Sequence, residues 1–324
     1  MLRKLGCLIL VLALFGAAFV GGNFVLGWTG DGPAKEEMTF VVPSGTSLAG
    51  AAELLEKAGA IKSASAFLQR AKIFGGSEPI KAGEFLIPAG ASNSQILRIL
   101  QGTDVIQRLV TIPEGMPSVL VQEKLMAEDM MTGDIPVPAE GSVLPESYSF
   151  ERGQPRAKML IAMQDAMKRT LDELWEKRSP DTVAKTPREA IILASIVEKE
   201  TGKPSERRMI AGVYSNRLRK GMMLQADPTI IYPITRGKPL GRRIRQSEIQ
   251  AVNDYNTYAM TGLPKGPITN PGRASIEAVL NPARTEALFF VADGTGGHVF
   301  SNTLEEHNRN VEKWFNLRRQ RGEM

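Results

Sequence analysis

One segment of the chain is so apolar that it has to form the interior of a folded domain. Seven of the eight residues from Ala190 to Val197 are apolar, and two carboxylates follow them. The preceding Thr186, Pro187 and Glu189 are typical of a helix start, because they supply an N-cap hydroxyl, a proline at the first helical position and a capping-box acid. Gly202 is typical of a helix end. The sequence therefore predicts a helix that is buried nearly all round by a surrounding domain.

The two acids that end this helix point in different directions. Glu200 lies three and four residues after Val197 and Ile196, so it projects from an apolar stripe. Glu198 lies about 200° away around the helix axis, at 100° per residue, so the two cannot share one face of a cleft. Burial and the negative helix C-terminus both disfavour the charged form of Glu200 and raise its pKa, as a general acid requires. Alternatively, both acids simply end the helix and meet solvent or an arginine.

Further blocks along the chain accompany the segment Ala194–Thr201. They are Asn216–Met222, Leu224–Thr229 with Tyr232, Tyr255–Tyr258, Gly262–Ile268 with Asn270–Gly272, Phe290–Gly294 with Gly297 and His298, and His307 with Asn308. Together and in this order, these blocks resemble those of the endolytic murein transglycosylases, which are bacterial inner-membrane enzymes that cut the glycan strands of peptidoglycan. In that family the catalytic glutamate is the second acid of the Glu-Lys-Glu motif, which the resemblance places at Glu200.

The chemistry of a lytic transglycosylase requires a single carboxylic acid. The acid protonates the glycosidic oxygen, and as a carboxylate it then deprotonates the sugar's 6-hydroxyl, which closes a 1,6-anhydro ring on MurNAc. A hydrolase would need a second carboxylate at a set distance. Residues that could supply one are Glu198, Asp227, Glu146 and Asp254. Asp227 precedes Pro228 and is better suited to form a turn or position substrate. Glu198 points away from Glu200, and this geometry favours the one-acid mechanism.

Two segments concentrate side chains suited to sugar binding. Tyrosine rings can stack on pyranose faces, and amides offer both hydrogen-bond donors and acceptors. The candidate substrate-binding residues are Gln225, Asp227, Thr229, Tyr255, Asn256 and Tyr258. For each of them, a place in a buried hydrogen-bond network that braces the Glu200 helix is the alternative. His298 and His307, nine residues apart beside Glu305 and Glu306, do not have a recognised zinc spacing; we therefore expect no metal site and no cofactor.

The N-terminus carries a long uncharged segment. No charged residue lies between Lys4 and Asp31, and the apolar run Leu5–Trp28 is long enough to span a bilayer as a helix. Arg3 and Lys4 precede it, so the positive-inside rule places residues 1–4 in the cytoplasm and the remainder in the periplasm. A cleaved signal peptide is the alternative, because Gly16-Ala17-Ala18 offers small residues near a cleavage site. The apolar run continues beyond that point, which favours a retained single-pass anchor in the inner membrane.

The fold class that we predict is α+β. The expected segments are a cytoplasmic N-terminus (1–4), a transmembrane anchor (5–28), a linker (29–37), a small α+β domain (38–104) and a larger α+β catalytic domain (105–324) with the buried catalytic helix. The resemblance implies that 38–104 is a LysM-like domain associated with glycan binding. Strands are expected near Phe40, at 80–87 and at 105–112, and helices at 48–58, 64–74, 94–101, 118–127 and 158–177. A helix from Pro204 to Gly221, a hairpin at 287–300 and a last helix at 303–320 follow.

Charge and composition limit the partners. The chain has 324 residues with 40 basic and 35 acidic side chains, an excess too small to indicate a nucleic-acid partner. Its single cysteine, Cys7, leaves the exported part without a disulfide. The resemblance implies that the partners are peptidoglycan glycan strands and peptidoglycan synthases. A non-catalytic glycan-binding scaffold of the cell-wall synthesis machinery is the alternative function.

Overall fold

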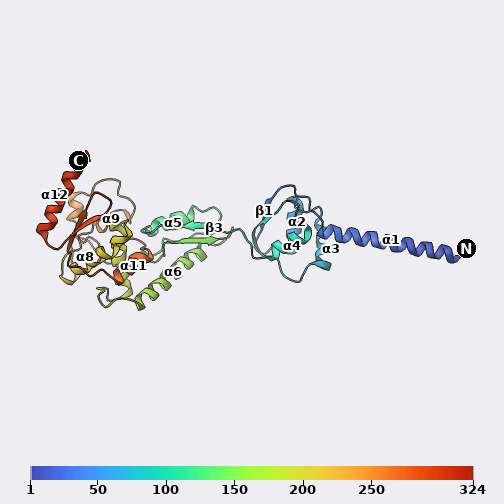
Figure 1. Cartoon of the computed structure of the whole chain (residues 1–324), viewed down its shortest axis with the longest axis horizontal. Coiled ribbons are helices and arrows are strands. Elements are labelled where there is room, and N and C mark those ends of the chain that lie inside the picture. The colour runs from blue at the N-terminus through green and yellow to red at the C-terminus, as the bar shows by residue number, and fades with distance from the viewer. Residues whose placement is uncertain (1, 324) are drawn as a thin grey trace. The chain divides into compact units, whose positions relative to one another are not determined.

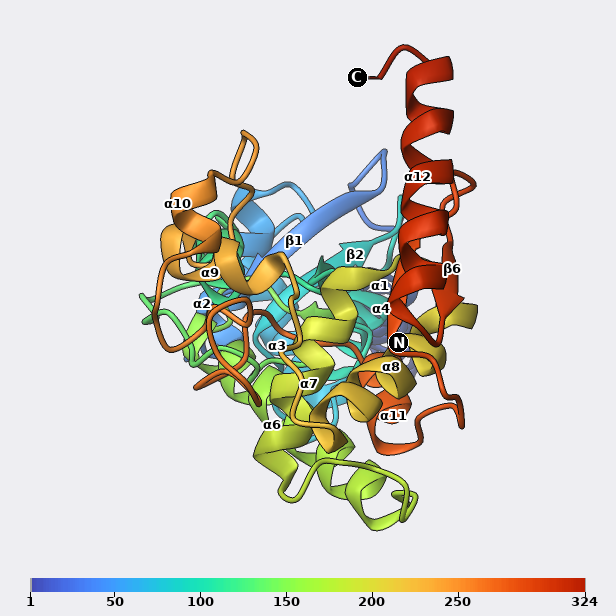
Figure 2. The same ribbon diagram turned by 90° about the vertical axis from the view of Figure 1, so that its left-hand side faces the viewer.

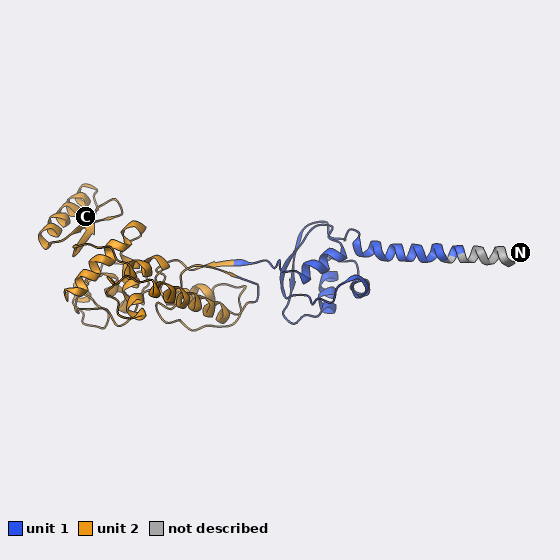
Figure 3. Ribbon diagram, turned by 60° about the horizontal axis from the view of Figure 1, so that its bottom comes forward, with its two compact units in different colours: residues 1–108, 150–153 blue, residues 109–149, 154–324 orange. Residues whose placement is uncertain are grey.

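We describe the chain from a computed structural model that covers residues 2–323; the side chains of residues 2–10 and of Ala13 lie outside the description. The chain divides into two compact units, coloured separately in Figure 3. Unit 1 comprises residues 1–108 and 150–153, and unit 2 comprises 109–149 and 154–324. Helices and short strands occur in both units, which confirms the predicted α+β class.

Unit 1 consists of a two-stranded antiparallel sheet covered by helices. Strand β1 (Met38–Val42) pairs with β2 (Gly83–Ile87), with Phe40 opposite Phe85. The helices are α2 (Leu48–Lys57), α3 (Ala64–Phe74) and α4 (Asn93–Gln101), each begun by a serine whose hydroxyl accepts a backbone N–H. The expected element order is confirmed here; β2 begins at Gly83 and not at Ile80, since residues 80–82 lie outside the ladder.

Helix α1 (Leu2–Thr29) covers the segment predicted to be a membrane anchor (Figure 1). Within the part of the chain that the structure describes, no helix is both long and apolar enough to cross a membrane. Residues 5–10 and 13 of the predicted anchor have side chains outside that description. The last turn of α1 packs into the core of unit 1: Trp28 is 6% exposed and its ring centre lies 5.9 Å from that of Phe67.

Unit 2 is built mainly from helices. Strands β3 (Arg108–Thr111) and β4 (Ser147–Phe150) form a two-stranded sheet, and β5 (Phe289–Ala292) and β6 (His298–Ser301) form an antiparallel hairpin. The helices are α5 (Ser118–Met126), α6 (Arg156–Glu176), α7 (Pro187–Glu200), the 3₁₀ turn η1 (Pro204–Glu206), α8 (Arg207–Arg219), α9 (Pro228–Thr235), α10 (Gln246–Ile249), α11 (Arg273–Leu280) and α12 (Leu304–Gln320). The sequence did not predict β4, α9, α10 or α11, which are short and follow proline or glycine-rich segments.

Helix α7 is the centre of unit 2, as its apolar sequence predicts. Every residue from Ala190 to Val197 is buried. Helices α6, α8, α9 and α11 all contact α7, and Figure 2 shows α7 and α8 running near each other with α11 beside them. Because neighbours cover all sides of α7, its burial stabilises the domain through the hydrophobic effect.

Both ends of α7 differ in detail from the expectation. The Thr186 hydroxyl accepts the Glu189 N–H, but the Glu189 carboxylate accepts from Lys185 N and not from the cap itself, so only half of the capping box forms. The helix ends at Glu200 and its C-cap is Thr201, in an extended conformation with φ −144°. Gly202 therefore does not cap the helix. The helix that we expected to begin at Pro204 begins instead with the η1 turn, and α8 follows from Arg207.

Candidate active site

Glu200 lines a pocket of about 300 Å³ in unit 2. The pocket residues come from the end of α7, from α8, from the loop before α9, from Tyr258 and from the C-terminal β5 and α12. They are Glu200, Tyr214, Arg217, Leu224, Gln225, Asp227, Tyr258, Phe290 and His307. This volume lies at the lower end of the range found for ligand pockets, ~300–1,000 Å³. The predicted helix end thus opens into a cavity that has the size of a small-ligand site.

The environment of Glu200 raises the pKa of its carboxyl group towards neutral pH. Burial raises the pKa of Glu200 to about 7; a hydrogen bond from Tyr214 opposes this, the charge of Asp227 raises it further, and that of Arg217 lowers it. The Oε1 atom of Glu200 is buried and has no hydrogen-bond partner among the described residues. The side chain can therefore carry a proton near neutral pH and has a free oxygen for a ligand.

Helix α8 supplies two side chains that the sequence analysis did not select for the site. Tyr214 is fully buried, and its hydroxyl bonds to Glu200. Arg217, one turn later, donates to Leu288 O at 2.6 Å, to Leu224 O at 2.9 Å and to Gln225 Oε1 at 3.2 Å. Arg217 thus holds the loop before α9 and the start of β5 around the pocket. The signal available in the sequence was a charged residue on an otherwise apolar helix face.

The loop before α9 brings Gln225 and Asp227 to the pocket. Gln225 has φ +53°, a left-handed conformation that is costly for a residue with a side chain, and Gln225 N donates to Thr257 O at 3.1 Å. The Tyr258 hydroxyl donates to Asp227 Oδ1 at 2.7 Å. Of the six candidate substrate-binding residues, Gln225, Asp227 and Tyr258 are therefore brought together with Glu200.

The other three candidates lie elsewhere. Asn256 is fully buried, and its amide donates to the carbonyl oxygens of Ile249 and Ala251 at 2.9 and 2.7 Å. Thr229 is also fully buried, and its hydroxyl lies 2.9 Å from that of Thr257. The ring of Tyr255 packs 4.8 Å from that of Tyr232, away from the pocket lining. Asn256 and Thr229 thus lie in buried hydrogen-bond networks, and the partners named here belong to neighbouring segments and not to α7.

Glu198 faces a different part of the domain from Glu200. Its carboxylate accepts the Gly272 N–H at 2.9 Å, at the N-cap of α11, and lies 3.6 Å from Arg207. A carboxylate in this position satisfies a free N–H and interacts favourably with the helix dipole. Glu198 thus links α7 to α11 and does not line the pocket.

We therefore expect Glu198→Ala to destabilise the fold. The change removes the acceptor of a buried N–H and one partner of Arg207, so the free energy of unfolding should fall by about 1–3 kcal/mol. Thermal or urea unfolding measures this loss. The rate at which the folded variant cleaves glycan strands should stay close to that of the wild type. A large fall in this cleavage rate at unchanged stability would contradict this role for Glu198.

The two histidines lie in different environments. His298 Nδ1 lies 2.8 Å from Glu206 Oε2, and His298 does not line the pocket. His307 lines it, stacked on Phe289 with ring centroids 5.2 Å apart. The remaining candidates for a second acid, Glu146 and Asp254, are also absent from the pocket lining within the described residues.

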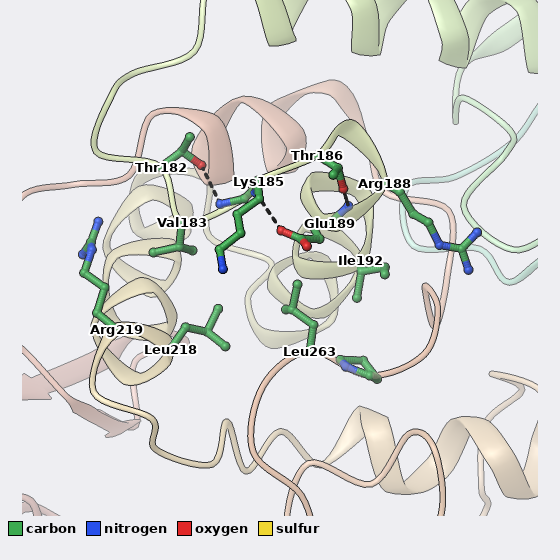
Figure 4. A pocket seen from close by; sticks show the side chains of 12 residues that line it. Thr182, Val183, Lys185, Thr186, Arg188, Glu189, Ile192, Leu218, Arg219 and Leu263 are labelled. Carbon is green, nitrogen blue, oxygen red and sulfur yellow. Dashed lines mark hydrogen bonds between the residues drawn. The ribbon is translucent and has the colours of Figure 1, made fainter.

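A larger pocket than that of Glu200 lies elsewhere in unit 2. It has a volume of about 870 Å³, and its lining includes Lys185 just before α7, Arg188 and Ile192 in the first half of α7, and Leu218 and Leu263 (Figure 4). The carboxyl group in it, Glu189, is held by the Lys185 N–H at 2.7 Å. Because Glu200 is at the opposite end of α7, we place the chemistry in the smaller pocket.

Comparison with known proteins agrees with the resemblance seen in the sequence. Residues 40–313 match the model of the YceG-like family. The chain belongs to the YceG-like family. The endolytic murein transglycosylase of Bacillus subtilis is 28% identical, with 95% of this chain and 93% of that protein covered. The endolytic murein transglycosylase of Streptococcus pneumoniae D39 is 30% identical over 88% of this chain, which spans 60% of that relative's length.

A solved structure extends this family assignment to the fold. The crystal structure of a YceG-like protein from Listeria monocytogenes has 28% sequence identity and a TM-score of 0.53, and the match covers 85% of this chain and 99% of that one. The predicted family is thereby confirmed, as is the expectation that this YceG-like chain is an enzyme of the lytic transglycosylase class. The alternative function, a non-catalytic glycan-binding scaffold, does not agree with this class.

Asp227 is expected to tune the acidity of Glu200 in this YceG-like protein. Asp227→Asn removes a negative charge that raises the pKa of Glu200 but keeps an oxygen that can accept from Tyr258. The pKa of Glu200 should fall, by roughly one unit or less, and the alkaline limb of the pH–rate profile should move to lower pH. Kinetics across the pH range measure the shift; a move to higher pH would contradict it.

Proposed function

We propose that this protein is an endolytic murein transglycosylase that cleaves the β-1,4 bond between MurNAc and GlcNAc within nascent glycan strands and leaves 1,6-anhydroMurNAc ends. Two relatives that cover most of this chain carry that name. The observation that carries the proposal is the state of Glu200: a carboxyl group with a pKa of about 7 and an unpaired buried oxygen in a pocket.

In the proposed reaction Glu200 acts twice. Protonated Glu200 gives its proton to the glycosidic oxygen while the bond to the MurNAc anomeric carbon breaks. The resulting carboxylate takes the proton of the MurNAc 6-hydroxyl, whose oxygen attacks the anomeric carbon and closes the anhydro ring. Glu200 ends protonated, as it began, and no water is consumed. Tyr214 and Arg217 stabilise the carboxylate between the two steps.

We assign the substrate contacts to the candidates that share the pocket with Glu200. Tyr258 offers a ring for stacking on a sugar, and Gln225 and Asp227 offer polar groups for its hydroxyls. Thr229, Asn256 and Tyr255 act through the loops that they brace. No resident metal or cofactor is part of this proposal.

The proposed location is the inner membrane. Residues 5–28 anchor the chain with residues 1–4 in the cytoplasm, and the catalytic domain works on the periplasmic side. The positive charges before the apolar segment support this orientation. The domain formed by 38–104 is proposed to be LysM-like and to hold glycan, and peptidoglycan synthases are the proposed partners that supply nascent strands.

Mass spectrometry of the products tests this function. The full-length protein in detergent, given uncrosslinked glycan strands in ¹⁸O-water, should release fragments that end in 1,6-anhydroMurNAc and carry no ¹⁸O. Reducing ends that carry ¹⁸O would show hydrolysis and overturn the non-hydrolytic mechanism. Intact strands would overturn the proposed substrate.

One observation favours hydrolysis as a second candidate. Asp227 lines the same pocket as Glu200 and influences its pKa, so a second carboxylate is within the site, as a hydrolase requires. The hydrogen bond from Tyr258 to Asp227 favours a positioning role instead. If Asp227 activated water, Asp227→Asn would abolish turnover rather than shift its pH dependence.

A further inference from the structure

The pocket contains a second buried polar atom that nothing in the protein satisfies. Nδ1 of His307 is buried and, within the described residues, has no hydrogen-bond partner. Glu200 and His307 are the residues of the described pocket lining that carry such an atom. A buried polar group left unpaired costs free energy, so a bound molecule is expected to pair with it.

The neighbours of His307 hold its ring in place but form no hydrogen bond with Nδ1. The ring is stacked on Phe289, with an interplanar angle of 22°. The Arg217 guanidinium lies 5.1 Å from the centre of the same Phe289 ring and is engaged with backbone carbonyls. Burial and the charge of Arg217 lower the pKa of His307. The imidazole is therefore neutral near pH 7, with one N–H donor and one acceptor.

The fold holds this side chain firmly at the pocket. His307 lies in the first turn of α12, which begins with a complete capping box of Thr303 and Glu306. Helix α12 packs against both strands of the hairpin that carries Phe289 and Phe290, as Figure 2 shows. His307 thus reaches Glu200's pocket from a segment about 100 residues later in the chain, on a rigid element and not on a loop.

We propose that His307 is a substrate-binding residue whose imidazole hydrogen-bonds to a hydroxyl group of the sugar held next to Glu200. A sugar hydroxyl can donate and accept, so it suits either tautomer of the ring. This inference rests on the proposed function and adds to it: the C-terminal helix contributes directly to sugar recognition, while proton transfer stays with Glu200.

Two substitutions distinguish the hydrogen-bonding role of Nδ1 from the stacking role of the ring. His307→Phe keeps an aromatic ring for stacking on Phe289 and removes both nitrogens. His307→Asn places an amide near the position of Nδ1. Asn308→Ala is the matched control, because Asn308 is exposed on the same turn and outside the pocket lining.

The first readout is binding without cleavage. In a Glu200→Gln background, the Kd for short uncrosslinked glycan strands should rise about tenfold or more with His307→Phe. His307→Asn should recover part of that loss, and Asn308→Ala should bind as the background does. The melting temperature should not fall with His307→Phe, because the change removes an unpaired buried nitrogen.

The second readout is the pH dependence of cleavage in the otherwise wild-type chain. His307→Phe should lower kcat/KM with the alkaline limb unmoved, because His307 transfers no proton in the reaction. A Kd equal to that of the background overturns the inference, whether or not the wild type cleaves. If His307→Phe lowers the melting temperature, His307→Asn decides, provided that it melts as the background does. A Kd raised above that of the background then supports the inference, and a Kd equal to that of the background overturns it. Failure of the wild type to form anhydro ends overturns the proposed function alone.

Discussion

Glu200→Gln is expected to reduce strand cleavage by about 10²–10⁴-fold, the usual contribution of a general acid or base. Glutamine has nearly the same shape, but it can neither give a proton to the glycosidic oxygen nor take one from the 6-hydroxyl. Strand binding should persist, because the pocket lining is otherwise unchanged. Single-turnover cleavage and equilibrium binding of the same strands measure the two effects separately.

Glu198→Gln is the matched control for this variant. It makes the same chemical change two residues earlier, where the side chain meets Gly272 and Arg207 outside the pocket. We expect it to cleave at close to the wild-type rate. An inactive Glu198→Gln together with a normally active Glu200→Gln would show that the wrong acid has been assigned.

The stability of Glu200→Gln provides a further control. The pKa of Glu200 is about 7 in the folded protein, whereas that of an ordinary, solvent-exposed glutamate is near 4.5. The folded state therefore binds more protons between these values, so stability falls as pH rises through this window and stays low above it. Glutamine does not ionise, so its contribution to stability does not change with pH. The variant should melt at the same temperature as the wild type at pH 4 and above it at pH 8.

Cleavage by the wild-type protein is expected to decline as pH rises through about 7. Above that value kcat/KM should fall about tenfold per pH unit, because the protonated fraction of Glu200 in the free enzyme falls in that proportion. Burial of the carboxyl group and the nearby charge of Asp227 raise the pKa of Glu200 to this value, and Tyr214 and Arg217 partly oppose the rise. Initial rates between pH 5 and 9, taken where the fold is intact, measure this limb.

The assignment of Glu200 as the acid would be contradicted by constant activity up to pH 9. An alkaline limb that lies near 4.5, the value of an unperturbed carboxyl group, would contradict the role of burial. Asp227→Asn supplies the internal check, since it should move the limb to lower pH without removing it.

Local pattern in the sequence was enough for much of the fold. The spacing of apolar residues predicted α7 and its burial, and it also predicted that Glu198 and Glu200 point apart, because helix geometry depends on residues within one or two turns. Apolar spacing also predicted α2, α4 and α12, and the structure adds that a serine or threonine hydroxyl caps the start of each. Short elements such as α9 and α11 were missed, since their few residues carry too little periodicity to stand out.

Tertiary structure alone decided which side chains share the pocket. Gln225, Asp227 and Tyr258 reach Glu200, whereas Asn256 and Thr229, each only two residues from one of them, are buried in hydrogen-bond networks outside the pocket. Tyr214 and His307 gave no local signal of their role, and the charge of Arg217 on an apolar helix face did not show which segments it would meet. The reason is physical: the helical period fixes the direction of a side chain relative to the helix axis. The neighbours that the side chain meets depend on how segments pack together from positions about 100 residues apart in the sequence.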